Sequence, residues 1–77
     1  MDFLLRRGRD YLALEVKATP RFATPMLAGL RGIGALSRVV RRLLVYRGGR
    51  ALRTEEGIDF WPVETVPDAV TRDKLWP

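Results

Sequence analysis

Three charged residues near the start of the chain have types and spacing suited to chemistry on a phosphate. Asp2 and Glu15 each carry a carboxylate, and Lys17 lies two residues after Glu15. Carboxylates that face each other on neighbouring strands repel, and a divalent cation between them reverses that interaction. Mg²⁺ binds oxygen ligands at about 2.0–2.1 Å and keeps several waters, which leaves room for a phosphate and an attacking water. Lys17 would orient that water or hold the phosphate, so the set predicts hydrolysis of a phosphodiester.

The same three residues also have a purely structural interpretation. Alternation of Glu and Lys is common on the solvent-facing side of a strand, and Asp2 stands at a chain terminus, where strands fray. We expect Asp10 to be a turn residue, and Trp61 and Trp76 to be packing anchors. On spacing alone, both interpretations of the charged set stay open.

Composition limits the chemistry that is possible. The chain has 77 residues, enough for one domain with a thin core, and it contains neither cysteine nor histidine. Disulfides, zinc sites built from cysteine and histidine, and Ser-His-Asp triads are therefore excluded. What remains is chemistry by carboxylates, amines, hydroxyls, backbone groups and a hard metal ion.

Basic residues are concentrated in the first two thirds of the chain. Residues 1–53 contain twelve basic and three acidic side chains, a net charge of +9, whereas residues 54–77 carry a net charge of −4. Nearly all of the basic residues are arginine, whose guanidinium can bind a phosphate through two parallel hydrogen bonds. Nucleic acid is therefore one predicted partner, and ordinary surface charge is the alternative explanation.

A β-hairpin would position the charged set. Alternating apolar residues predict strands over residues 2–7 and 11–17, joined by a turn at Gly8-Arg9. That turn pairs Arg7 with Asp10 and sets Asp2 opposite Glu15. We expect one face of the hairpin to form the core against a helix, and Asp2, Glu15 and Lys17 to converge on the other, exposed face. The expected core face consists of Phe3, Leu5, Leu12, Leu14 and Val16.

The rest of the chain predicts a helix between two parallel strands. Thr24-Pro25 is a good helix start, and leucines and Ile33 recur at helical spacing as far as Leu36. Apolar runs at 42–47 and 57–63 predict strands, and residues 67–75 a short helix. A right-handed crossover makes the strands at 11–17 and 42–47 parallel. The expected fold is α/β: a small mixed sheet, built from the hairpin, a βαβ crossover and a C-terminal strand, with one main helix.

This order of residues resembles the C-terminal domain found in a large prokaryotic group of AAA-type ATPases. That domain belongs to the PD-(D/E)XK nuclease-like superfamily. The resemblance covers nearly the whole chain, and the Asp…Glu-x-Lys element is its most specific part. It rests on Asp2-Phe3-Leu4-Leu5, Leu14-Glu15-Val16-Lys17-Ala18, Leu27 to Leu36, Val45-Tyr46-Arg47-Gly48 and Phe60-Trp61-Pro62-Val63.

The resemblance implies a restriction-endonuclease-like core that acts on DNA or RNA. In that family Mg²⁺ is held by the aspartate and the glutamate, so Asp2 and Glu15 would be the metal ligands and Lys17 the catalytic lysine. The family's arginine-rich helix region, which would bind nucleic acid, is represented here by Arg31, Arg38, Arg41 and Arg42.

The chain departs from the family at its start. It begins one residue before the motif aspartate, without the preceding helix and strand that such domains usually carry, and it contains no P-loop. We therefore expect residues 1–77 to be a single nuclease-like domain fragment, truncated at the N-terminus. Its first strand would be an open edge, covered by a second copy or by a missing partner chain.

Two functions follow from the sequence. One is a Mg²⁺-dependent nuclease or a degenerate relic of one, and the other is a non-catalytic nucleic-acid-binding or partner-docking module related to an AAA-type ATPase. The chain shows no targeting signal, and no apolar run approaches the ~20 residues of a membrane span. We expect a cytoplasmic protein that makes no contact with a membrane.

Overall fold

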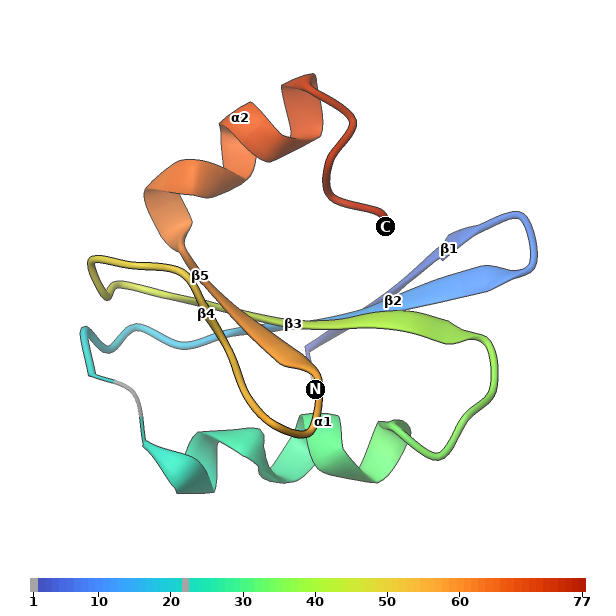
Figure 1. Cartoon of the computed structure of the whole chain (residues 1–77), viewed down its shortest axis with the longest axis horizontal. Helices are drawn as coiled ribbons and strands as arrows, with labels where there is room; N and C mark the ends of the chain where they lie inside the picture. The colour runs from blue at the N-terminus through green and yellow to red at the C-terminus, as the bar shows by residue number, and fades with distance from the viewer. Residues whose placement is uncertain (1, 22) are drawn as a thin grey trace.

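A computed structural model describes residues 2–21 and 23–77, which form a five-stranded mixed sheet with a short helix on each side (Figure 1). The strands lie in the order β1-β2-β3-β5-β4. β1 is antiparallel to β2, β3 is parallel to both β2 and β5, and β4 is antiparallel to β5. The small mixed α/β fold predicted from sequence is therefore confirmed. The strands are β1 (Phe3–Arg7), β2 (Asp10–Val16), β3 (Val39–Tyr46), β4 (Leu52–Arg53) and β5 (Ile58–Pro62).

The helices are shorter than the sequence pattern predicts. The main helix consists of the 3₁₀ turn η1 (Thr24–Leu27) and α1 (Ala28–Ile33), and the chain closes with η2 (Val63–Thr65) and α2 (Val66–Thr71). α1 ends at Ile33, with Gly34 as its C-cap, and does not reach Leu36, because several glycines weaken the helix by about 1 kcal/mol each relative to alanine. Among residues 2–21 and 23–77, no helix combines the length and apolarity needed to cross a bilayer.

The hairpin has the predicted register. Phe3 pairs with Leu14, Leu5 with Leu12, and Arg7 with Asp10. Gly8 has a φ of +62°, a conformation that glycine adopts at no steric cost and that closes the two-residue loop. The crossover through α1 then returns the chain beside β2, so β2 and β3 are parallel as predicted.

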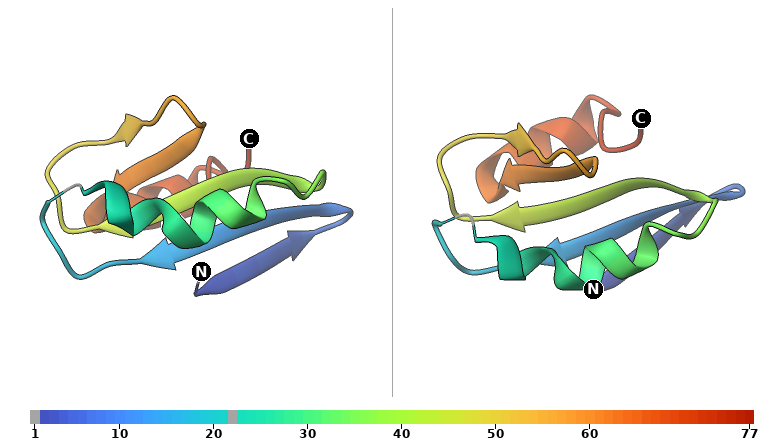
Figure 2. Two further views of the ribbon diagram at one scale, coloured as in Figure 1. Left: turned by 90° about the horizontal axis from the view of Figure 1, so that it is seen from below. Right: turned by 60° about the horizontal axis from the view of Figure 1, so that its bottom comes forward.

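The core lies on both faces of the sheet, since a helix covers each one (Figure 2). On the α1 side, the buried cluster consists of Ala13, Leu27, Leu30, Leu44, Tyr46, Ile58 and Phe60. On the α2 side, Leu12, Leu43 and Val45 are buried beneath Leu5, Leu14, Trp61, Val66, Leu75 and Trp76.

The predicted core face of the hairpin is wrong in two respects. Leu12 and its neighbours on that face pack against the C-terminal segment rather than the main helix, because the small side chain of Ala13 lets α1 approach the opposite face. Phe3 and Val16, which the pattern assigned to the core, are 53% and 47% exposed. Phe3 lies on β1, which has only β2 as a sheet neighbour among the residues described, so little covers this edge.

Candidate functional site

The three residues singled out by their chemistry lie at one end of the sheet. β2 and β3 are parallel, so both end there, and β1 begins there because it is antiparallel to β2 (Figure 2). Asp2 precedes β1, Glu15 is the penultimate residue of β2, and Lys17 follows β2 directly. We call this region the carboxyl end of the sheet. In open α/β sheets, this is where ligands bind.

Two hydrogen bonds fix Asp2 opposite Glu15. The backbone N–H of Asp2 donates to the carbonyl of Leu14 at 3.2 Å, and Oδ2 of Asp2 accepts from the N–H of Val16 at 2.9 Å. These partners flank Glu15 on either side. The Asp2 carboxylate is therefore held at the junction of β1 and β2, with the rest of the side chain exposed to solvent.

Glu15 does not lie on an exposed wall, contrary to the prediction. Its exposed fraction is 5%, and its register partner on β3 is Leu44, a member of the buried cluster beneath α1. The alternation along β2 places Glu15 on the same face as Ala13, which α1 covers. The backbone thus brings Asp2 and Glu15 together, but it places the Glu15 side chain inside the α1 side of the domain.

The residues at the carboxyl end supply two carboxylates and one amine. Lys17 is exposed, and its backbone N–H donates to the carbonyl of Val45 at 2.9 Å, so its position is fixed by β3. No group of three or more Asp, Glu, His or Cys residues that could hold a metal ion occurs within the described residues. A Mg²⁺ ion at Asp2 and Glu15 would therefore complete its octahedral coordination with water, backbone carbonyl or phosphate oxygens, as Mg²⁺ commonly does.

Two of the arginines expected to bind nucleic acid are engaged within the domain. Arg31 forms a bidentate pair with Glu56, with 2.6 Å from Nε to Oε2 and 2.9 Å from Nη2 to Oε1. The hydrogen bond from Arg31 holds the pKa of Glu56 below its usual range. Arg42 donates to the backbone carbonyls of Leu30 and Glu56, which ties α1 to the loop before β5. Both guanidinium groups therefore have structural partners.

The other two arginines differ from each other. Arg41 is largely buried on the α2 side, where Nε lies 3.5 Å from Oδ2 of Asp59 and Nη1 donates to the carbonyls of Lys74 and Leu75. Arg38 is exposed in the loop before β3. Of the four arginines predicted to bind nucleic acid, only Arg38 is both exposed and without an ion pair to the described residues.

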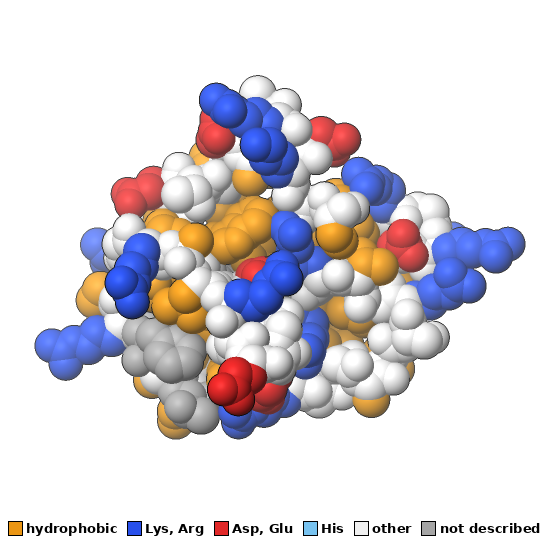
Figure 3. All heavy atoms as spheres, in the orientation of Figure 1, with side chains coloured by type: hydrophobic (Ala, Val, Ile, Leu, Met, Phe, Trp, Pro, Cys, Tyr) orange, Lys and Arg blue, Asp and Glu red, His pale blue; other side chains and the backbone are white. Residues whose placement is uncertain are grey.

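The carboxyl end of the sheet carries other cations that the sequence analysis did not single out. Arg21 lies in the loop after β2, and Arg47 and Arg50 lie in the loop after β3; all three are exposed, as is Lys17. None of the four side chains forms an ion pair with a residue in 2–21 or 23–77. Basic side chains project from the left of the molecule in Figure 3, where these loops lie in Figure 1. The signal in the sequence was their position in the segments that follow two parallel strands.

A buried carboxylate on the opposite side of the sheet was also missed. Asp59 is 6% exposed and accepts two hydrogen bonds from Arg53, at 2.6 Å from Nε and 3.1 Å from Nη2. These bonds raise the pKa of Arg53. Asp59 interrupts the apolar run from Ile58 to Phe60, which is the feature of the sequence that could have revealed it.

Comparison with known proteins leaves the family open. The sequence matches no protein-family profile, and no curated protein or solved structure is significantly similar to the chain.

Proposed function

We propose that the carboxyl end of the sheet is a Mg²⁺-dependent phosphodiester-hydrolysing site of the PD-(D/E)XK type, acting on DNA or RNA. The observation that carries the proposal is the pair of hydrogen bonds that sets Asp2 opposite Glu15, with Lys17 directly after the end of β2. The order of a hairpin, a crossover helix and a parallel strand agrees with the restriction-endonuclease-like core that the sequence resemblance implies.

Each residue has a defined task in this proposal. Mg²⁺, when bound, would lower the pKa of a coordinated water and polarise the phosphate. Asp2 and Glu15 would supply its carboxylate ligands, with the exposed Asp2 on the solvent side and the buried Glu15 on the α1 side. Lys17 would hold the phosphate or orient the water. Arg47, which follows β3 at the same end of the sheet, would neutralise a neighbouring phosphate of the chain.

Cleavage of supercoiled plasmid and of single-stranded RNA tests the proposal. We expect the chain to cleave at least one of them in Mg²⁺ or Mn²⁺, and we expect Glu15→Gln and Lys17→Gln to lose that activity. The matched controls are Glu55→Gln and Lys74→Gln, because both residues are exposed and lie away from the carboxyl end. Lys17 is itself exposed, so its replacement leaves the core intact even where replacement of buried Glu15 does not. A folded chain that cleaves neither substrate, or controls that lose activity equally, would contradict the proposal.

A second candidate function is nucleic-acid binding without catalysis, favoured by the four exposed cations at the carboxyl end. Neutralising about four phosphates releases their counterions, so the slope of log K against log salt concentration is expected to be about −3 to −4 for duplex DNA. Arg47→Gln should reduce the magnitude of that slope by about 0.9, since it removes one contact. Fluorescence anisotropy at several salt concentrations measures it.

Arg72→Gln is the control for this binding experiment. Arg72 lies at the end of α2 and is paired with Asp68 at 3.1 Å, so its removal should leave the slope unchanged. Binding that does not respond to salt, or equal slopes for the Arg47 and Arg72 variants, would show that the carboxyl end is not the binding surface.

A further inference from the structure

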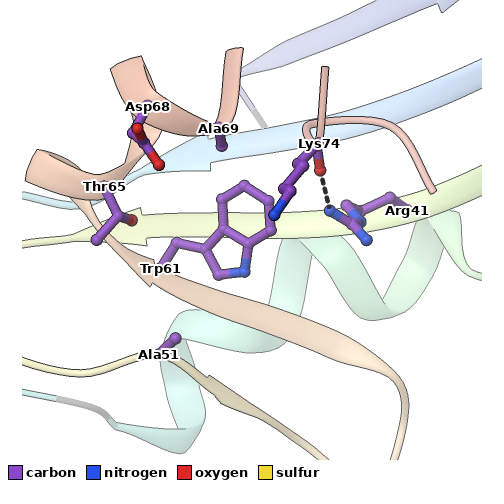
Figure 4. Close-up of a pocket in the computed structure, with 7 residues that line it drawn as sticks. All are labelled: Arg41, Ala51, Trp61, Thr65, Asp68, Ala69 and Lys74. Carbon is purple, nitrogen blue, oxygen red and sulfur yellow. Dashed lines mark hydrogen bonds between the residues drawn. The ribbon is translucent and has the colours of Figure 1, made fainter. Parts of the chain in front are cut away.

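A cavity lies on the α2 side of the sheet, away from Asp2 and Glu15. The cavity has a volume of about 400 Å³ and is open to solvent between the sheet and α2 (Figure 4). Trp61 on β5 and Arg41 on β3 line it from the sheet, Thr65, Asp68 and Ala69 from the helical segment, and Lys74 from the C-terminal segment. Its size falls within the ~300–1,000 Å³ of small-molecule sites.

The floor of the cavity is aromatic. Figure 4 shows the indole ring of Trp61 lying between the sheet and Ala69, and Figure 3 shows hydrophobic side chains exposed beneath α2. The guanidinium of Arg41 lies 5.0 Å from the centre of this ring, a cation–π contact. Trp61 is half-buried and lines the cavity, so the exposed part of its indole is a surface on which a flat ring can stack.

Arg41 is held in place at the edge of the cavity. Its Nε faces Asp59 at 3.5 Å, and its Nη1 donates to the carbonyls of Lys74 at 3.2 Å and Leu75 at 3.1 Å. These contacts use two of its three nitrogens. Within the described residues, Nη2 has no hydrogen-bond partner, so it remains able to donate to an oxyanion in the cavity.

The cavity has a positive charge. Among the residues that line the cavity, Arg41 and Lys74 are cationic and Asp68 is anionic, which gives a net charge of +1. The Asp68 carboxylate is paired with Arg72 at 3.1 Å. Lys74 forms no ion pair within residues 2–21 and 23–77, and its side chain extends toward Trp61 in Figure 4. The site thus combines a stacking surface with two cationic donors on one side.

We propose that this cavity binds a planar aromatic anion, namely a free nucleoside monophosphate. The base stacks on Trp61 beneath Ala69, and the phosphate accepts hydrogen bonds from Lys74 and Arg41. A neutral ring would use only the stacking surface, and a phosphate alone would use only the cations, so the nucleotide is the ligand that uses both. The proposal shares no residue with the hydrolytic site and holds whether or not that site is active.

Titration of the intact chain with AMP tests this site, with the indole N–H signals of Trp61 and Trp76 followed by ¹⁵N NMR. We expect a saturable shift of the Trp61 signal with a dissociation constant of about 1 mM or below. Lys74→Gln should weaken AMP binding by about tenfold, because it removes a charge-assisted hydrogen bond. Lys17→Gln is the matched control: Lys17 is the only other lysine, is also exposed, and belongs to the carboxyl end.

Adenosine and inorganic phosphate separate the two halves of the site. Each should bind more weakly than AMP, and Lys74→Gln should affect phosphate but not adenosine. The proposal is overturned by the absence of a saturable Trp61 shift up to ~10 mM AMP. It is also overturned if Lys17→Gln weakens AMP binding as much as Lys74→Gln does, or if adenosine binds as tightly as AMP.

Discussion

Replacing Phe60 with alanine is expected to lower the free energy of unfolding by about 4 kcal/mol. Phe60 is fully buried beneath α1, and its ring meets that of Tyr46 edge to face, with centroids 5.5 Å apart. The substitution removes the burial of the ring and leaves a cavity. A domain of this size has a total stability of about 4–12 kcal/mol, so the variant should keep about 0–8 kcal/mol and be about half unfolded at the lower end of that range.

Phe3→Ala is the matched control for this prediction. Phe3 is 53% exposed on β1, so its removal should change stability by about 0.5 kcal/mol or less. Urea unfolding followed by circular dichroism measures both variants. Similar midpoints for Phe3→Ala and Phe60→Ala would contradict the burial of Phe60 in the cluster beneath α1.

Replacing Asp59 with asparagine is expected to lower the free energy of unfolding by about 3 kcal/mol. This value is at the lower end of the range for breaking a buried ion pair. Asp59 has a nearly buried side chain and accepts from Arg53 while facing Arg41, whose side chain is only 12% exposed. Without the carboxylate, Arg41 keeps a positive charge that water reaches poorly. The Arg53 side chain is 63% exposed, so solvent screens its charge, and the loss of its contact with Asp59 contributes less to the destabilisation than the loss of the Arg41 contact.

Asp68→Asn provides the comparison for Asp59→Asn. Asp68 pairs with Arg72 in an exposed i,i+4 contact, and both side chains are more than 60% exposed. Such pairs contribute about 0.3–0.5 kcal/mol. The free energies of unfolding of the two variants, measured in urea, should differ by about 2 kcal/mol or more. Equal stabilities would show that the contacts of Asp59 with Arg41 and Arg53 do not act as a buried ion pair.

Much of the topology could be predicted because local signals and long-range constraints agree. Gly8 and the alternation of apolar residues fixed the hairpin register, and the crossover through α1, long enough to return the chain to the same end of the sheet, predicted that β2 and β3 are parallel. The strand predicted over residues 57–63 is present as β5 and ends at Pro62, which has no N–H to continue the ladder. The two-residue strand β4 was not predicted, since a segment of that length has no periodicity to detect.

The choice of core face failed because periodicity identifies two faces but not what covers each one. Both faces of β2 are apolar in part, and the pattern favoured the side with the larger residues Leu12 and Leu14. The structure places the small Ala13 beneath α1 and covers the larger leucines with the C-terminal segment, including Trp76. Only the three-dimensional path of the last fifteen residues decides this.

The candidate site could be predicted in part. The opposition of Asp2 and Glu15 follows from the hairpin register, which the sequence specifies. The burial of Glu15 follows from the position of α1, which the sequence does not specify. The partners of Arg31, Arg41 and Arg42 depend on contacts between distant segments, so an arginine that appears available in the sequence proves to be engaged in the structure.

Binding of Mg²⁺ to the intact chain tests the central claim most directly. In a titration followed by NMR, we expect saturable shifts of the backbone signals of Asp2, Glu15 and Lys17, and their loss in Asp2→Asn. Asp2 is exposed, so this variant should keep the fold and the remaining spectrum. Saturable shifts confined to these residues would support a metal site at the carboxyl end of the sheet. Shifts that do not saturate, or that are as large at the exposed Asp68 as at Asp2, would contradict it.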